Sequence, residues 1–213
     1  MPLYKTITVN NDTKVLIWKI EESYEDLRAG IDLTSPCQSR LEGMKSNIHR
    51  RGFLSVRHLL AVEGYTDHDL FYDTEGKPHL QDEKFISITH SFTFSAIIIG
   101  NAAVGIDIEK QRDKILLIAQ KFTPIKEYRT LANFEALIRK LTIVWGAKES
   151  IYKLYAQPGV SFLQHINITD FDFDDFKTTG KVLFKGETSY YKLDFLEFEG
   201  FTCVYALPEK ILV

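Results

Sequence analysis

Short runs of alternating apolar and polar residues recur along this chain and predict β-strands. Residues 4–9 and 15–20 alternate on either side of the polar segment 10–12, which predicts a β-hairpin. By the same criteria, further strands are predicted at residues 85–91, 94–99, 104–109, 166–168, 181–184, 190–198 and 201–207.

Helical periodicity fills much of the sequence between these strands. After a break at Ser35-Pro36, an amphipathic stretch extends from about residue 38 to residue 62, and Gly64 ends it. The longest predicted helix covers residues 134–155 and is terminated by Pro158-Gly159. The two halves of the chain therefore run through hairpin, helix and strands in a loosely similar order. Two shorter helical segments, 115–122 and 125–131, flank Pro124.

One predicted strand carries two carboxylates on a single face. Its sequence is VGIDIE, residues 104–109. Because a strand directs alternate side chains to opposite faces, Asp107 and Glu109 share one face and the isoleucines take the other. The ordinary explanation of this pattern is a half-buried edge strand whose acidic residues face solvent.

A third carboxylate lies in the longest helix, within the segment WGAKESIYK. Trp145, Glu149 and Lys153 follow one another at intervals of four residues, so they fall roughly along one stripe. A glutamate and a lysine at this spacing are ordinarily a solvent-exposed helix pair. If this glutamate and the two strand carboxylates instead converge in a cleft, their repulsion requires a cation. An all-oxygen ligand set suits Mg²⁺ or Mn²⁺ rather than zinc.

Composition limits the classes of function. The chain has 213 residues, 45% of them hydrophobic, which is enough for one domain or for two small ones packed closely. A net charge of −3 does not fit the broad basic surface of a nucleic-acid-binding protein. Cys37 and Cys203 are isolated, as in proteins of a reducing compartment. Without a signal core or an apolar run long enough to span a membrane, we expect a soluble, cytoplasmic protein.

Two more motifs contain groups that bind anions. The segment GKPHL, residues 76–80, is predicted to form a turn that presents Lys77. The strand FISITHS ends with a hydroxyl, an imidazole and a hydroxyl at Thr89, His90 and Ser91. Each motif also has an ordinary explanation, because most GKP tripeptides are simple loops and most histidines at strand ends are merely hydrogen-bonded.

Taken in order, GKPHL, ITHS, VGIDIE and WGAKESIYK resemble the signature motifs of the 4′-phosphopantetheinyl transferase superfamily. The resemblance is to the larger monomeric, surfactin-synthetase-activating type, which serves fatty-acid, polyketide and nonribosomal peptide synthesis. It implies an α+β fold of two similar α/β subdomains in a pseudo-twofold arrangement, with coenzyme A in the cleft between them. We expect subdomains at residues 1–100 and 101–213, the second carrying the metal site.

The resemblance also implies a reaction, that of a holo-acyl-carrier-protein synthase. The 4′-phosphopantetheine group of coenzyme A moves to a serine of an acyl or peptidyl carrier protein, and 3′,5′-ADP is released with the help of Mg²⁺. The matching metal ligands are Asp107, Glu109 and Glu149, and Lys153 matches the lysine that contacts the pyrophosphate. Glu149 is the first candidate for the general base, with Glu127 as the second.

Other matches concern coenzyme A and the carrier protein. Thr89 and His90 match the groups that bind a coenzyme A phosphate, and Lys77 matches a lysine near the nucleotide. For the 3′-phosphate Arg50 is the best candidate, with Arg51 and Lys45 as alternatives. An acidic carrier protein requires a local basic patch, for which the candidates are Lys121, Lys126 and Arg129.

Two positions depart from the family pattern. Thr89 stands where serine is common, which keeps the hydroxyl but adds a methyl group, and Lys121 stands where arginine is frequent. Two other functions remain open beside transfer: a non-catalytic relative that binds coenzyme A or a carrier protein, and a metal-dependent phosphodiesterase using the same carboxylates.

Overall fold

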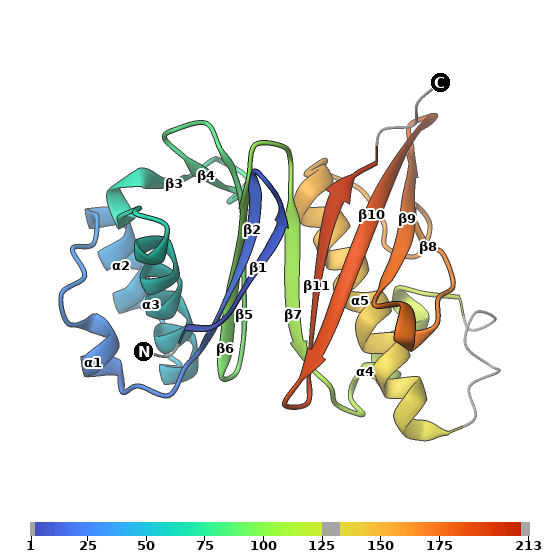
Figure 1. The fold of residues 1–213 in the computed structure, drawn as a ribbon, viewed down its shortest axis with the longest axis horizontal. Helices are drawn as coiled ribbons and strands as arrows, with labels where there is room; N and C mark the ends of the chain where they lie inside the picture. The colour runs from blue at the N-terminus through green and yellow to red at the C-terminus, as the bar shows by residue number, and fades with distance from the viewer. Residues whose placement is uncertain (1–2, 125–132, 210–213) are drawn as a thin grey trace. The chain divides into compact units, whose positions relative to one another are not determined.

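The computed structural model describes residues 3–124 and 133–209 and divides into two compact units, residues 1–102 and 103–213. The boundary expected from the sequence lies two residues earlier, between residues 100 and 101. Helices and strands occur in both units, so the fold is of mixed α+β type (Figure 1). Each unit is described separately below.

Unit 1 is built on a four-stranded antiparallel sheet with the strand order β1-β2-β6-β5. The first two strands form the hairpin that alternation predicted at the start of the chain. Strand β6 is buried at every position, which explains why its sequence is an uninterrupted apolar run rather than an alternating one. The strands are β1 (Leu3–Asn10), β2 (Thr13–Lys19), β5 (Phe85–Ser91) and β6 (Phe94–Gly100).

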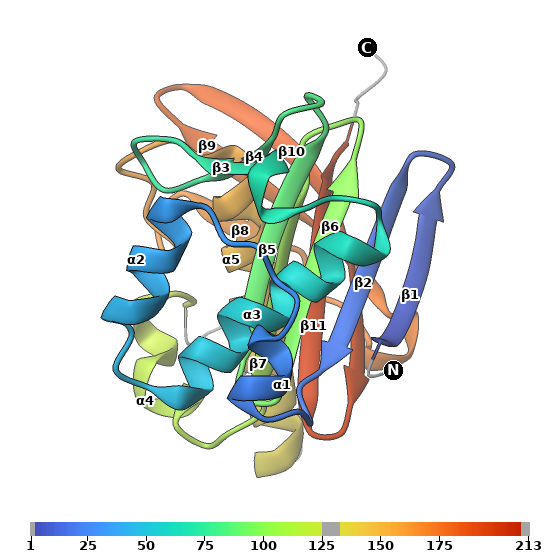
Figure 2. The same ribbon diagram turned by 90° about the vertical axis from the view of Figure 1, so that its left-hand side faces the viewer.

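Helices cover one face of this sheet, with α3 lying across it (Figure 2). The predicted helix from residue 38 to 62 is wrong, because the chain forms two helices with an extended backbone at Met44 between them. Ser35-Pro36, predicted as a break, instead begins α2, where proline fits because the first turn needs no backbone N–H. The helices are α1 (Tyr24–Arg28), α2 (Ser35–Gly43) and α3 (Asn47–Val62).

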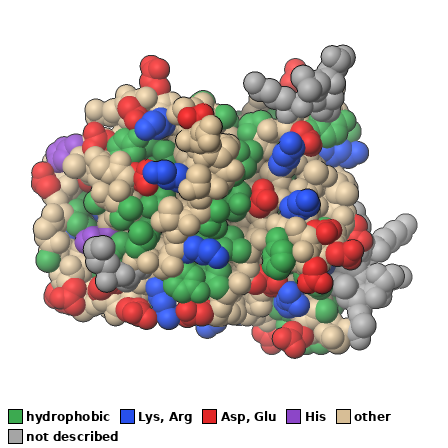
Figure 3. Space-filling model, in the orientation of Figure 1, with side chains coloured by type: hydrophobic (Ala, Val, Ile, Leu, Met, Phe, Trp, Pro, Cys, Tyr) green, Lys and Arg blue, Asp and Glu red, His purple; other side chains and the backbone are tan. Residues whose placement is uncertain are grey.

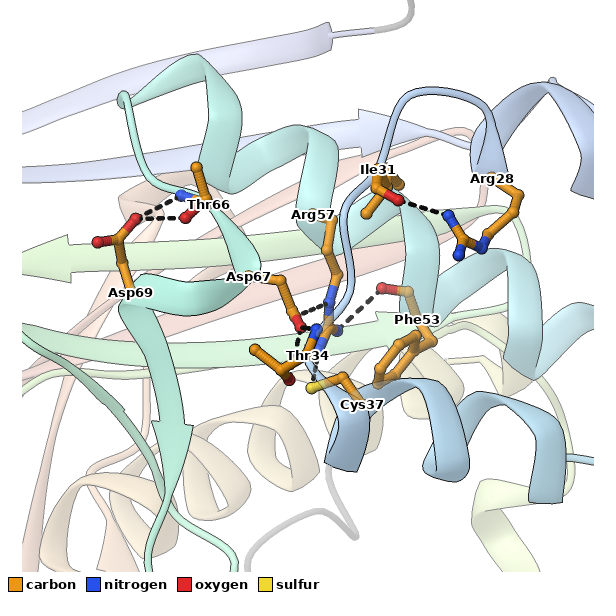
Figure 4. Close-up of polar contacts among 9 residues, drawn as sticks. All are labelled: Arg28, Ile31, Thr34, Cys37, Phe53, Arg57, Thr66, Asp67 and Asp69. Atoms are coloured by element: carbon orange, nitrogen blue, oxygen red, sulfur yellow. Dashed lines mark hydrogen bonds and ion pairs between the residues drawn. The ribbon is translucent and has the colours of Figure 1, made fainter.

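A buried ion pair ties these helices to the loop that follows them. Arg57 Nε in α3 donates to Asp67 Oδ1 at 2.8 Å, and its other nitrogens contact the Phe53 carbonyl oxygen and Cys37 Sγ (Figure 4). Thr34 donates to the second carboxylate oxygen from its backbone N–H and its hydroxyl. Neither this network nor the short element η1 (Asp67–Asp69) was predicted, and the hairpin of β3 (Leu70–Tyr72) with β4 (Pro78–Leu80) was not predicted either.

Unit 2 is a five-stranded antiparallel sheet with the strand order β7-β11-β10-β9-β8. All five strands were predicted, although β9 and β10 begin earlier than their alternation indicated. Between β8 and β9, the acidic segment of residues 171–176 is a loop that contains the short helical turn η4 (Phe173–Asp175). The strands are β7 (Gly105–Lys110), β8 (Ile166–Ile168), β9 (Lys177–Phe184), β10 (Glu187–Phe198) and β11 (Phe201–Pro208).

The long helix α5 (Phe134–Tyr155) packs against this sheet and begins and ends where the sequence predicted. Its first turn is capped by the Asn133 side chain, which accepts a hydrogen bond from the Ala136 N–H. The core between α5 and the sheet includes Ala147, Ile151, Leu193, Val204 and Ala206, all nearly inaccessible to solvent. Two short elements precede the helix, α4 (Ile115–Ile118) and η2 (Ala119–Lys121), and the predicted helix at 125–131 lies outside the described residues.

Surface properties agree with the low net charge. On the face drawn in Figure 3, acidic and basic side chains are interspersed among apolar ones. Among the helices within residues 3–124 and 133–209, none has the length and apolar character needed to cross a bilayer.

Candidate active site

The carboxylates of VGIDIE lie at the contact between β7 and α5. Asp107 is buried and Glu109 is partly exposed, while Ile106 and Ile108 are completely buried. A Cβ atom on Gly146 of α5 would lie 3.9 Å from Asp107 Oδ2, so the carboxylate points toward the helix. Asp107 therefore lies on the helix-facing side of the strand, and the ordinary explanation that its carboxylate faces solvent is wrong for this residue.

A lysine from α5 contacts the first of these carboxylates directly. Lys153 Nζ lies 2.8 Å from Asp107 Oδ1 and donates a second hydrogen bond to the Ile106 carbonyl oxygen at 2.9 Å. Asp107 is nearly inaccessible, whereas the lysine side chain keeps 28% of its exposure. Lys153 therefore forms an ion pair with a carboxylate on the neighbouring strand, which the ordinary explanation of a solvent-exposed pair with Glu149 does not include.

Glu149 lies in the electrostatic field of both strand carboxylates. Its pKa is raised to about 7, first by burial and then by repulsion from Asp107, with a smaller contribution from Glu109. Lys153 opposes this shift through its positive charge. The sequence placed these three acids together on the basis of spacing and resemblance, and the structure brings them within electrostatic range of one another.

The donor set suits a hard divalent cation, because every side chain in it offers carboxylate oxygen and none offers sulfur or imidazole nitrogen. A cation there would also relieve the repulsion that raises the pKa of Glu149. The three carboxylates do not form a coordination shell in this structure. Within the described ranges, no three His, Cys, Asp or Glu residues are placed to hold a metal ion. Asp107 instead has the Lys153 ammonium against it.

Several candidate phosphate-binding groups belong to unit 1. Thr89 and His90 are adjacent on β5, the threonine buried and the histidine exposed. The His90 ring lies next to the His49 ring of α3, with 6.0 Å between ring centroids. Lys77 is partly buried in the turn before β4, and this burial lowers its pKa against the opposing charge of Asp73.

The basic candidates for a 3′-phosphate have local roles in unit 1. Arg50 Nε donates to the Met44 carbonyl oxygen at 2.7 Å, so this guanidinium supports the connection between α2 and α3. Arg51 donates to the Ile20 carbonyl oxygen at 3.0 Å. Lys45 is exposed in the α2–α3 connection.

The family model that describes the 4′-phosphopantetheinyl transferase superfamily matches residues 103–206, a region that contains all four residues of the β7–α5 site. The region of residues 103–206 belongs to the 4′-phosphopantetheinyl transferase superfamily. A search of curated proteins found no match. The resemblance of VGIDIE and WGAKESIYK to the transferase motifs is therefore confirmed, whereas GKPHL and ITHS precede the matched residues.

One buried residue of the transferase region was not singled out from the sequence. Lys148, beside Glu149, is only 2% exposed, and its ammonium donates to the carbonyl oxygens of Phe122, Phe162 and Ile166. These hydrogen bonds hold the segment at Phe122 and the segment from Phe162 to Ile166 against α5. The sequence did contain a signal, because Lys148 lies four residues after the buried Val144 and three before the buried Ile151.

Some of the predicted functional residues lie outside the part of the chain that the structure describes. Glu127, the second candidate for the general base, and the basic residues Lys126 and Arg129 lie outside the described residues. Lys121 is described, and it is exposed at the end of η2.

Proposed function

We propose that this chain transfers 4′-phosphopantetheine from coenzyme A to a serine of an acyl or peptidyl carrier protein and releases 3′,5′-ADP. Membership of the transferase superfamily supports the reaction class. The observation that carries the proposal is the meeting of Asp107 and Lys153, with Glu149 and Glu109 in electrostatic range, at one strand–helix contact. A carboxylate cluster with an adjoining ammonium is suited to a diphosphate bound together with a cation.

Asp107, Glu109 and Glu149 would hold Mg²⁺, and Mn²⁺ fits the same oxygen ligands. Bound there, the cation would supply neutralising charge for the diphosphate of coenzyme A. Lys153 can turn its ammonium from Asp107 toward a phosphate oxygen, because the side chain is long and more than a quarter exposed. The lysine would then offset the negative charge that accumulates on the leaving group.

The serine hydroxyl of the carrier must lose its proton as it attacks phosphorus. We propose Glu149 as the base, acting directly or through the metal, because it lies on α5 beside Lys153 and within electrostatic range of Asp107. Glu127 is the second candidate. Thr89 and His90 are proposed to bind a coenzyme A phosphate and Lys77 to approach the nucleotide, with Arg50 at the 3′-phosphate ahead of Arg51 and Lys45.

The enzyme is further proposed to be of the larger monomeric type. Each of the two units has its own buried core, so one chain supplies two compact folded units. Light scattering on the purified protein at micromolar concentration should give the mass of a single chain, and a stable dimer would contradict this assignment.

The deciding experiment supplies apo carrier protein, coenzyme A and Mg²⁺ and follows the carrier by mass spectrometry. A gain in carrier mass of one phosphopantetheine group supports transfer. Cleavage of coenzyme A without this gain would favour a phosphodiesterase, and binding without either reaction would favour a non-catalytic relative. Chelation by EDTA should abolish the mass gain and added Mg²⁺ should restore it, whereas undiminished transfer after chelation would refute the metal assignment.

A further inference from the structure

Helix α3 contains a glycine where its backbone does not require one. Gly52 is buried in the first half of this 16-residue helix and has no positive φ angle. Glycine in a helix interior is destabilising relative to alanine, because it loses more conformational freedom on folding. A reason for glycine at this position must therefore come from what packs against it.

The neighbour of Gly52 is the imidazole of His90. A Cβ atom built on Gly52 would lie 3.0 Å from His90 Cγ, 3.2 Å from Nδ1 and 3.4 Å from Cβ. These are the three nearest heavy atoms, and all belong to the histidine side chain. A methyl group at this position would therefore press on the ring itself and displace it by a few tenths of an ångström.

Helix α3 also meets the His90 ring one turn before Gly52. His49 precedes Gly52 by three residues, so the two lie on the same side of α3. The His49 and His90 rings are 6.0 Å apart between centroids and inclined at 44°. His90 thus lies against a surface of α3 formed by one imidazole and one position without a side chain.

The backbone around this contact is held in place by buried serines. Ser55 Oγ lies 2.8 Å from the Gly52 carbonyl oxygen and 2.7 Å from Ser95 Oγ. Ser95 is the cross-strand partner of His90 in the β5–β6 ladder. Helix and sheet are therefore connected beside the histidine, and a methyl group on Gly52 would move the ring more easily than the backbone.

We propose that Gly52 is a positioning residue: by lacking a side chain it sets the direction in which the His90 imidazole meets a phosphate of coenzyme A. This inference rests on the proposed function, which assigns His90 to that phosphate. A purely structural role for Gly52 predicts a different result, because a glycine needed for packing alone would lower stability when replaced and leave ligand affinity unchanged.

The test compares Gly52→Ala, His90→Ala, the double variant and the control Gly43→Ala by calorimetric titration with coenzyme A and by thermal unfolding. Gly43 is a fair control because it also lies in a helix and nothing lies within 4 Å of its would-be Cβ. We expect Gly52→Ala to weaken coenzyme A binding about tenfold, as for the loss of one hydrogen bond to a charged group, without lowering the unfolding temperature. Gly43→Ala should bind as wild type.

The double variant separates positioning from packing. If the methyl group acts through the ring, adding Gly52→Ala to His90→Ala will not weaken binding further. Equal weakening in both backgrounds, or wild-type affinity of Gly52→Ala, would overturn the inference while leaving the transfer assay unaffected. Wild-type affinity of His90→Ala would overturn both the inference and the role of His90.

A folding failure of Gly52→Ala would also be informative. If the methyl group clashes only with the imidazole, the double variant will fold with the stability of His90→Ala, and this would support the contact with the ring on which the inference depends. A double variant that fails to fold would assign Gly52 to backbone packing and contradict it.

Discussion

Gly105 of β7 touches the backbone of Ser150 in α5 so closely that a Cβ atom on the glycine would lie 1.9 Å from the serine carbonyl oxygen. Strand and helix therefore approach to a distance that no other residue type allows. This close approach brings Asp107, two residues further along the strand, to the helix that carries Glu149 and Lys153. The geometry of the proposed active site depends on it.

We predict that Gly105→Ala will destabilise the protein by about 3 kcal/mol, because overpacking against a fixed backbone forces the strand and helix apart. Urea unfolding followed by circular dichroism measures this difference. Gly43→Ala serves as the control, since the added methyl group meets nothing within 4 Å and should change stability by less than about 0.5 kcal/mol. Equal stabilities for the two variants would contradict the close approach.

Lys153→Met tests the role of the ammonium. Methionine is similar in length but has no charge, so it cannot neutralise a phosphate oxygen, and we expect transfer to fall about 100-fold in kcat/KM. The exposed Lys181 on β9 provides a control, because Lys181→Met changes net charge by the same amount away from the carboxylates. A comparable loss in both variants would indicate a general effect of charge instead of a local one.

Lys148→Met tests how much the hydrogen bonds from Lys148 to Phe122, Phe162 and Ile166 stabilise the fold. Removing an ammonium that binds three carbonyl oxygens leaves those oxygens without this donor, so we expect a loss of about 3 kcal/mol in the free energy of unfolding. Chemical denaturation provides the measurement, with Lys181→Met again as the control. A loss no greater than that of the control would show that the three hydrogen bonds contribute little.

The lowered pKa of Asp67 predicts that the stability of the folded protein depends on pH. Burial raises its pKa, but hydrogen bonds from Thr34 and the charge of Arg57 outweigh burial and bring the pKa below its ordinary value. A lowered pKa in the folded state means that Asp67 stabilises the fold above the unfolded-state pKa of about 4, and that this contribution is lost as pH falls through the folded-state value.

We therefore expect Asp67→Asn to be about 3 kcal/mol less stable than wild type at pH 7, because it leaves the buried Arg57 charge unpaired. The gap should persist at pH 5 and narrow below about pH 4. Urea unfolding at a series of pH values measures it, and Asp12→Asn in the exposed β1–β2 turn is the control. A gap that widens as the solution becomes acidic would contradict the assigned shift.

The sequence predicted those elements whose ends are marked by local chemistry. Helix α5 has an uninterrupted periodicity, an asparagine cap and a terminating Pro158-Gly159, and its bounds were predicted in full. The separation of α2 from α3 was missed because Leu41, Met44 and Ile48 continue the helical spacing through the break. The three-residue strands β3 and β4 are too short to show alternation.

The same distinction applies to the site. The common face of Asp107 and Glu109 follows from strand geometry, so the sequence predicted it. The partner of the Lys153 ammonium depends on how closely β7 approaches α5, which periodicity does not encode. The contact of Gly52 with His90 joins a helix to a strand more than 30 residues away in the chain, and only the folded structure reveals it.

The central claim is that Asp107 and Glu149 act together on a diphosphate. Its most direct test is the mass of an apo carrier protein after incubation with coenzyme A, Mg²⁺ and either wild-type enzyme, Asp107→Ala or Glu149→Ala, each first shown by circular dichroism to be folded. We predict that the wild-type enzyme adds one phosphopantetheine group to the carrier and that neither variant does. Transfer by either folded variant at the wild-type rate would contradict the claim.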